Sequence, residues 1–258
     1  MAEPYICFEN LNKIYHTRSG DVQAVVDVNF GIRECEFVAV VGPSGCGKTT
    51  LLKMLAGLLP YSSGAITIGG KKVTEPQTDV GIVFQDAIML DWRDVLSNVM
   101  LQIDIRHMDR SRYLPIAAEL LQKVGLAGFE KKKPYELSGG MRQRVSICRA
   151  LVHDPPLLLL DEPFGALDAL TREQIAMDIQ HLWMEKRKTA LFITHSIPEA
   201  VLLADHVVVM SPRPGRIVEI IDVDLPRPRR LDRIDPRFND YAGHIRDIFK
   251  SKGVLAMD

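Results

Sequence analysis

The segment from Gly42 to Thr50 carries the strongest chemical signal in the chain. It reads Gly-Pro-Ser-Gly-Cys-Gly-Lys-Thr-Thr and fits the pattern GxxxxGK followed by Ser or Thr, which holds phosphate chains in proteins. An apolar run, Phe37–Val41, predicts a strand directly before it, and a helical pattern follows from Leu51. In such a loop, glycines let backbone N–H groups turn toward a phosphate chain, and the helix N-terminus adds partial positive charge. We therefore expect Lys48 to reach the β and γ phosphates and Thr49 to offer its hydroxyl to Mg²⁺. The predicted phosphate-binding residues are Gly42, Pro43, Ser44, Gly45, Cys46, Gly47, Lys48, Thr49 and Thr50.

Two adjacent carboxylates, Asp161 and Glu162, end a second apolar run, Leu157–Leu160. In an enzyme with a phosphate loop, the first carboxylate holds Mg²⁺, usually through water, and the second polarises the attacking water for in-line displacement. We therefore predict Asp161 as a metal ligand and Glu162 as a catalytic residue. These two features alone leave GTPases and small-molecule kinases open.

The segment Leu137-Ser-Gly-Gly-Met-Arg-Gln-Arg144 lies shortly before the second apolar run and resembles the signature motif of ATP-binding cassette (ABC) proteins. Ser138, Gly139 and Gly140 open a predicted helix, so this segment could present a hydroxyl and backbone N–H groups to a phosphate. The resemblance covers about residues 5–225, and its motifs occur in the family's order. It implies that the nucleotide is ATP.

Four further residues take their expected roles from this resemblance. It implies that Tyr15 stacks on adenine, although Tyr15 could instead be an ordinary tyrosine at a strand end. Gln85 resembles the glutamine that links Mg²⁺ and the γ-phosphate side to the helical subdomain. Asp168 closes a segment, Gly165-Ala-Leu-Asp, that resembles the loop communicating between two subunits, with Gly where Ser is common. His195 resembles the histidine that contacts the γ-phosphate, and Ser196 follows it where many relatives have Asp. The resemblance thus implies Lys48, Glu162 and His195 as the catalytic set.

The flanks of these motifs resemble the ATPase subunits of importers for nitrate, sulfonates and taurine. The flanking segments are Asp91-Trp92, Phe164–Arg172 and Met210–Arg216. This resemblance implies a dimer, with an identical chain or a second cassette subunit, in which the phosphate loop of one subunit and the signature of the other enclose each ATP. It also implies two membrane permease subunits, which contact the region after Gln85, and indirect work with a periplasmic or extracellular solute-binding protein. Trp92 could lie in that contact or pack in the core.

The elements behind these residues predict an α/β fold with a mixed, largely parallel sheet, as in a P-loop NTPase of the RecA-like type. Two N-terminal runs, Ile6–Lys13 and Gln23–Phe30, predict an antiparallel β-subdomain joined by a turn at residues 18–21. A stretch at about 87–150 has helical spacing at Ile116, Leu120, Leu121 and Val124 and predicts a helical insertion. Other predicted strands are Phe37–Val41, Ala65–Ile68, Val80–Phe84, Leu157–Leu160, Ala190–Thr194, His206–Met210 and Ile217–Val223.

The chain is expected to divide into an ATPase domain, residues 1–225, and a C-terminal extension, residues 226–258. The extension begins with the basic segment Pro226-Arg-Pro-Arg-Arg230, which we interpret as a solvated linker, with a binding patch as the alternative. A helix is predicted at Arg237–Lys250.

Composition limits the partners and the compartment. The 258 residues include 32 Lys plus Arg and 33 Asp plus Glu, so the net charge of −1 provides no bulk field for nucleic acid or an anionic membrane. Four scattered cysteines favour a reducing cytosol. No leader-like segment is visible, and no run approaches the roughly 18 apolar residues that span a bilayer. We expect a peripheral subunit on the cytoplasmic face of the cell membrane that binds no nucleic acid.

Two alternatives remain beside an importer ATPase. One is a soluble ABC-type ATPase not coupled to transport, but the translation type usually carries two cassettes and the repair type a long coiled-coil insertion, and 258 residues accommodate neither. The other is a GTPase, which is disfavoured because Asn12-Lys13-Ile14-Tyr15 lacks the Asp of a guanine-reading NKxD motif.

Overall fold

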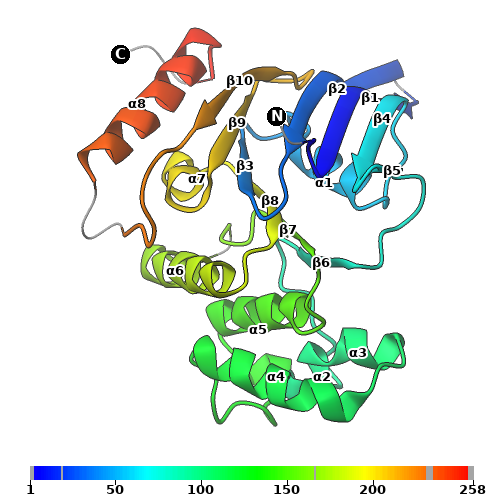
Figure 1. The fold of residues 1–258 in the computed structure, drawn as a ribbon, viewed down its shortest axis with the longest axis vertical. Coiled ribbons are helices and arrows are strands. Elements are labelled where there is room, and N and C mark those ends of the chain that lie inside the picture. Colours follow the sequence, from blue (N-terminus) through cyan, green and yellow to red (C-terminus); the bar gives the residue numbers. More distant parts are fainter. Residues whose placement is uncertain (1–2, 19, 166, 231–234, 255–258) are drawn as a thin grey trace. The chain divides into compact units, whose positions relative to one another are not determined.

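A computed structural model describes residues 3–18, 20–165, 167–230 and 235–254 (Figure 1). The chain forms two compact units. Unit 1 contains the described residues up to Thr78 and those from Arg187 onward, and unit 2 contains Asp79–Lys186. Unit 2 is therefore inserted into the sequence of unit 1. The expected division at residues 225 and 226 stays a prediction.

Unit 1 begins with the predicted antiparallel β-subdomain. Its four strands run in the order β2 (Gly20–Ile32), β1 (Ile6–Thr17), β4 (Ser63–Ile68) and β5 (Lys71–Lys72). The turn predicted at residues 18–21 includes Ser19, which lies outside the described residues. Apolar side chains alternate along β1, and the rings of Phe8 and Phe30 stack with centroids 4.4 Å apart.

A second group of strands in unit 1 holds the phosphate-loop strand. The strand β3 (Phe37–Val41) pairs in parallel with β8 (Thr189–Thr194) and with β9 (His206–Met210), and β10 (Ile217–Asp222) runs antiparallel to β9. All five residues of β3 are buried, as expected of a central strand covered on both faces. The helices of this unit are α1 (Lys48–Leu55), α7 (Ile197–Leu203) and α8 (Pro236–Ser251).

Unit 2 contains two parallel strands and the predicted helical insertion. The strand β6 (Val80–Val83) pairs with β7 (Leu157–Asp161). The helices are α2 (Val95–Val99), α3 (Leu101–Ile105), α4 (Arg110–Lys123), α5 (Gly139–Leu151) and α6 (Ala169–Glu185), with a 3₁₀ turn at Pro134–Glu136. Leu121 and Val124 are buried in the core of these helices, so the periodicity correctly indicated its inward face.

The basic segment Pro226–Arg230 is not a solvated linker, and that prediction is wrong. Arg227 forms an ion pair with Asp205 and donates to the carbonyl of Leu203. Arg229 is only 6% exposed, and both terminal nitrogens of its guanidinium group donate to backbone carbonyls. The acceptors belong to Val201, Ala204, Val223 and Leu225. Carbonyls at the end of a helix lack intrahelical partners, and Arg229 satisfies those of α7. Burial lowers the pKa of Arg229 to about 10.

An ionic cluster surrounds His206 at the start of β9. Its imidazole lies 2.5 Å from Glu36 through Nε2 and 2.5 Å from Asp222 through Nδ1. The hydrogen bond with Glu36 raises the pKa of His206 and outweighs the opposing effect of burial. Burial tends to raise the pKa of Glu36, but hydrogen bonds from His206 and Arg33 outweigh it and lower the value to about 2. The cluster is therefore held together by charge over an intermediate range of pH.

Within the described part of the chain, no helix is both long enough and apolar enough to cross a membrane.

Candidate active site

The predicted phosphate loop connects β3 to α1. Gly45 and Gly47 have φ angles of +77° and +102°, which glycine adopts readily and other residues rarely. Gly47 is also the N-cap of α1, and a Cβ at this position would lie 2.8 Å from the carbonyl oxygen of Ala24 and from Cγ2 of Val25. No side chain fits at Gly47, so this position requires glycine. The first N–H groups of α1 lie at this loop.

Lys48 is buried inside this loop. Its ammonium donates to the carbonyl oxygens of Gly42, at 2.9 Å, and Pro43, at 3.2 Å. The next residues, Thr49 and Thr50, are half-buried on the first turn of α1. A fixed cation at the N-terminus of a helix provides the positive potential that a polyphosphate requires.

The loop at residues 211–216 supports the phosphate loop from outside the motif. The N–H of Gly215 donates to the carbonyl of Ala24 at 2.9 Å, and the N–H of Val26 donates to the carbonyl of Gly215 at 2.9 Å. A Cβ on Gly215 would lie 1.9 Å from the carbonyl oxygen of Cys46. In the sequence analysis this segment contributes only to the family resemblance, and its packing against the phosphate loop is not predicted. Gly215, between a rigid proline and a charged arginine, was a usable signal for such packing.

Tyr15 lies beside the first turn of α1. Its hydroxyl is 3.2 Å from Oγ1 of Thr50, so the structure brings the predicted adenine-stacking residue next to the phosphate-binding helix. The ring is half-buried at the end of β1. Its stacking on adenine stays a prediction.

His195 follows β8 and is exposed. The chain turns sharply after it, because the N–H of Ser196 donates to Oγ1 of Thr194 at 2.9 Å. Ser196 is also the N-cap of α7, and its hydroxyl accepts from the N–H of Glu199 at 3.5 Å. Serine therefore performs a capping role at the position where many relatives have Asp.

In unit 2, Asp161 is the last residue of β7 and is 6% exposed. Glu162 follows with a φ of +44°, an unusual value for a residue that is not glycine. The N–H of Gly165 donates to the carbonyl of Glu162 at 3.1 Å, which closes the turn. Strained backbone of this kind is typical of sites where a side chain must take one direction.

The donor chemistry fits Mg²⁺. Thr49, Gln85 and Asp161, predicted as metal ligands, all offer hard oxygen atoms. Among the residues that the structure describes, no group of three or more His, Cys, Asp or Glu could hold a metal ion. Oxygen donors of this kind suit Mg²⁺, which in nucleotide sites takes its remaining ligands from phosphate and water. The joint role of these three residues as a metal site stays a prediction.

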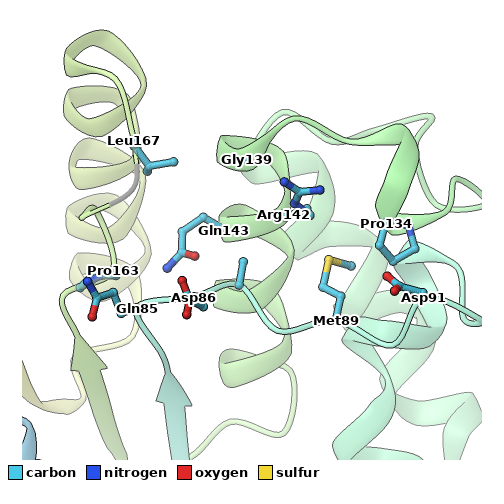
Figure 2. A pocket seen from close by; sticks show the side chains of 11 residues that line it. Gln85, Asp86, Met89, Asp91, Pro134, Gly139, Arg142, Gln143, Pro163 and Leu167 are labelled. Carbon is cyan, nitrogen blue, oxygen red and sulfur yellow. The ribbon is translucent and has the colours of Figure 1, made fainter.

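Gln85 follows β6 and lines a cavity of about 350 Å³ in unit 2 (Figure 2). A Cβ at Gly165 would lie 3.4 Å from Nε2 of Gln85, so the glutamine lies next to the turn that follows Glu162. Gln143 of α5 donates to the carbonyl of Phe84 at 3.4 Å and joins this helix to the end of β6. The other residues of the lining are Asp86, Ala87, Met89, Asp91, Pro134, Gly139, Arg142, Gln143, Pro163 and Leu167.

Trp92 lies close to this cavity in sequence and is 74% exposed. The alternative that it packs in the core is therefore wrong. Its loop is well fixed, because the buried amide of Asn98 bonds both the N–H and the carbonyl of Leu90. Lys133 also donates to the carbonyl of Trp92 at 3.0 Å. Ile88, in the same segment, is 61% exposed.

The predicted signature residues begin α5. Ser138 is the N-cap, and its hydroxyl oxygen accepts from the N–H of Met141 at 3.2 Å. Gly139 is exposed, and a Cβ there would have no atom within 4 Å. Gly140 differs, because a Cβ would lie 2.4 Å from Cγ2 of Thr171. Gly140 thus allows α5 and α6 to approach closely.

Asp168 is the N-cap of α6. Its carboxylate accepts from the N–H of Thr171 at 3.0 Å, and this backbone hydrogen bond lowers the pKa of Asp168. The signature and Asp168 therefore lie at the N-terminal ends of two helices that pack together at Gly140 and Thr171. Ala166, within the predicted segment Gly165–Asp168, lies outside the described residues.

Comparison with known proteins decides the family. A family model described as "ABC transporter" matches residues 25–165. The chain belongs to the ABC transporter family. The taurine import ATP-binding protein TauB of Rhizobium johnstonii is 47% identical over 236 residues, which cover 89% of this chain and 90% of that protein. The bicarbonate transport ATP-binding protein CmpD of Synechocystis is 41% identical over 253 residues, which cover 96% and 90%.

A solved structure agrees with these relatives. It is a dimeric, post-hydrolysis state of the ATP-binding cassette MJ0796 bound to ADP and Pi, and it matches with a TM-score of 0.75 at 30% identity. The match covers 86% of this chain and all of that one. These findings confirm the predicted P-loop α/β fold, the binding of ATP, and its hydrolysis in the service of transport. They disfavour a soluble ABC-type ATPase that is not coupled to transport.

Proposed function

We propose that this chain is the ATP-hydrolysing subunit of an importer for a small solute of the nitrate, sulfonate or taurine type. The observation that carries this proposal is the phosphate loop, in which Lys48 is held between loop carbonyls at the start of α1. The names of the relatives support import, because one serves taurine and another bicarbonate. The protein lies on the cytoplasmic face of the membrane as a peripheral subunit.

We assign the ATP phosphates to the loop Gly42–Gly47, Lys48 and the hydroxyl-bearing start of α1. Lys48 neutralises the β and γ phosphates from its fixed position. Mg²⁺, when bound, shields the phosphate charge, and Thr49, Gln85 and Asp161 are the residues that would hold it. Tyr15 provides the ring on which adenine stacks.

Hydrolysis is assigned to Glu162 and His195. The carboxylate of Glu162 takes the proton of the attacking water, and its unusual backbone angle directs the side chain. His195, at the exposed end of β8, contacts the γ-phosphate. Lys48 completes the catalytic set by stabilising charge on the transferred group.

The active form is a dimer with an identical chain or a second cassette subunit. Ser138 and Gly139 serve the ATP of the partner, and the open space around Gly139 supports this role. Asp168 communicates between the two subunits. The dimeric state of the solved cassette supports the dimer.

Residues 87–107 form the contact with the two membrane permease subunits, and the solute-binding protein acts only through those subunits. The support is the exposed pair Ile88 and Trp92 on a loop fixed by Asn98. Exposed apolar side chains on ordered backbone are typical of protein interfaces. Gln85, at the start of this segment, connects nucleotide state to the contact.

Two isosteric substitutions at neighbouring positions test the catalytic assignment. Glu162→Gln removes the base and should slow hydrolysis by about 10²–10⁴-fold while ATP binding survives. Asp161→Asn should instead weaken the Mg²⁺-dependent part of ATP binding. With Mg-ATP, the Glu162→Gln chain should elute as a closed dimer on size exclusion, and with Mg-ADP as a monomer. Parent-like hydrolysis by Glu162→Gln would overturn the assignment.

Cross-linking tests the permease contact. A cysteine at Trp92 should capture a permease subunit in the assembled transporter. A cysteine at Ile220 on β10, which is 45% exposed, is the matched control and should not. Equal capture from both positions, or none from any exposed position in residues 87–107, would contradict the proposal.

A further inference from the structure

Lys13 is a charged residue in an unusual environment. It lies on β1 and is only 9% exposed. Its ammonium donates to the carbonyl oxygen of Pro60 at 2.7 Å and lies 5.1 Å from the centroid of the Tyr15 ring. Taking an ammonium out of water is unfavourable, and methionine would fill the same space without that penalty. The charge therefore calls for a reason other than packing.

The Tyr15 ring is restrained from several directions. Its backbone pairs with Val22 of β2, and its hydroxyl reaches Oγ1 of Thr50 on α1. The ammonium of Lys13 lies over one face of the ring. An aromatic ring has two faces, and the ammonium of Lys13 lies over only one of them.

We propose that Lys13 is a positioning residue for the adenine base of ATP. This inference rests on the proposed stacking role of Tyr15. The cation fixes the plane of the Tyr15 ring and attracts its π electrons toward one face. The opposite face then becomes a better partner for an electron-rich base, since stacked rings repel through like quadrupoles. Lys13 thereby tunes base binding without touching the nucleotide.

A purely structural role for Lys13 makes a different prediction. The carbonyl of Pro60 follows α1, so the hydrogen bond from Lys13 also ties β1 to the chain beyond the phosphate-binding helix. If this tie were the only function, its loss would disturb the phosphate loop. Binding of any ligand with a triphosphate group would then weaken, whether or not the ligand carried a base.

The experiment compares ATP with inorganic triphosphate, which has the phosphates but no base. Dissociation constants are measured by calorimetry on the full chain with Mg²⁺ for Lys13→Met and Lys13→Arg. We expect Lys13→Met to weaken ATP binding by about two- to tenfold and to leave triphosphate binding within twofold of the parent. Lys13→Arg keeps the cation and should bind ATP like the parent.

A matched control exists in the same unit. Lys72 also lies over a tyrosine ring, with its ammonium 5.9 Å from the centroid of Tyr61, but it is exposed. Lys72→Met should leave both ligands unaffected. If Lys13→Met lowers the folded fraction, Lys13→Gln, which keeps an N–H donor for Pro60 but no charge, provides the same comparison.

The outcomes separate the two proposals. The role of Lys13 is overturned if Lys13→Met weakens the binding of ATP and of triphosphate equally. It is also overturned if Lys13→Met binds ATP like the parent while Tyr15→Ala binds ATP poorly. Either result leaves the stacking role of Tyr15 standing. Parent-like ATP binding by Tyr15→Ala would remove the stacking role itself and, with it, this inference.

Discussion

The contact between the starts of α5 and α6 can be tested by replacing Gly140 with alanine. The added Cβ would lie 2.4 Å from Cγ2 of Thr171, well inside van der Waals contact. Thr171 is β-branched, so its χ1 has little freedom to turn the methyl group away, and the two helices must separate. Overpacking of this kind costs about 1–3 kcal/mol. For a chain of this size that corresponds to a fall in Tm of roughly 2–12 °C.

The adjacent Gly139 provides the control, since an alanine Cβ there meets no atom within 4 Å. Gly139→Ala should be neutral or stabilise by up to about 1 kcal/mol, because alanine reduces the entropy of the unfolded chain. Thr171→Ser removes the offending methyl group, so Gly140→Ala in that background should cost less than about 0.5 kcal/mol. Thermal and urea unfolding, followed by circular dichroism, measure all four variants. The steric argument fails if Gly140→Ala is as stable as Gly139→Ala, or if Thr171→Ser gives no rescue.

Three further predictions concern unit 1. Lys48→Ala should weaken ATP binding by about 10–100-fold and abolish turnover, and an unchanged hydrolysis rate would remove Lys48 from the site. Gly215→Ala, whose Cβ would lie 1.9 Å from the phosphate-loop backbone, should lower both Tm and ATP affinity in thermal melts and calorimetry. The control is Gly243→Ala on α8, whose Cβ meets nothing within 4 Å, and it should leave ATP affinity unchanged while Tm stays the same or rises. The raised pKa of His206 stabilises the fold fully below the ordinary pKa of 6.5, and this stabilisation is lost as pH rises through the folded pKa. The lowered pKa of Glu36 stabilises the fold above pH 4.5, and this stabilisation is lost as pH falls from 4.5 toward 2. His206→Gln should therefore lower Tm most between about pH 4.5 and 6.5 and progressively less as pH rises above that range, and a pH-independent difference would contradict this.

Local pattern was enough to predict most of the fold. The strand Phe37–Val41 was predicted with its observed bounds because a β-branched apolar run before a glycine-rich loop has few alternatives. The start of α5 at Gly139 followed from the capping serine at 138. Motif spacing likewise placed the candidate site residues at strand ends and helix N-termini, where the structure has them.

Contacts between residues far apart in sequence could not be predicted in this way. The acceptors of Arg229 lie up to 28 residues away and are carbonyls, which leave no mark in a pattern of side chains. The approach of Gly215 to Cys46 and that of Gly140 to Thr171 depend on packing distances that no spacing reveals. The exposure of Trp92 was undecided for a related reason, because a tryptophan suits both a core and an interface.

The interrupted sequence of unit 1 has a consequence for how the protein is made. All of unit 2 leaves the ribosome as one uninterrupted segment, Asp79–Lys186, and its core can close as soon as that segment has emerged. The strand β3 has no partner strand when it emerges from the ribosome, because its pairing with β8 begins at Ala190, opposite Phe37. At about 5–20 residues per second, this strand remains unpaired on both edges for roughly 8–30 s of synthesis. An apolar strand exposed for that long is a site for aggregation, so newly made chains need protection there until the last third of the protein has been translated.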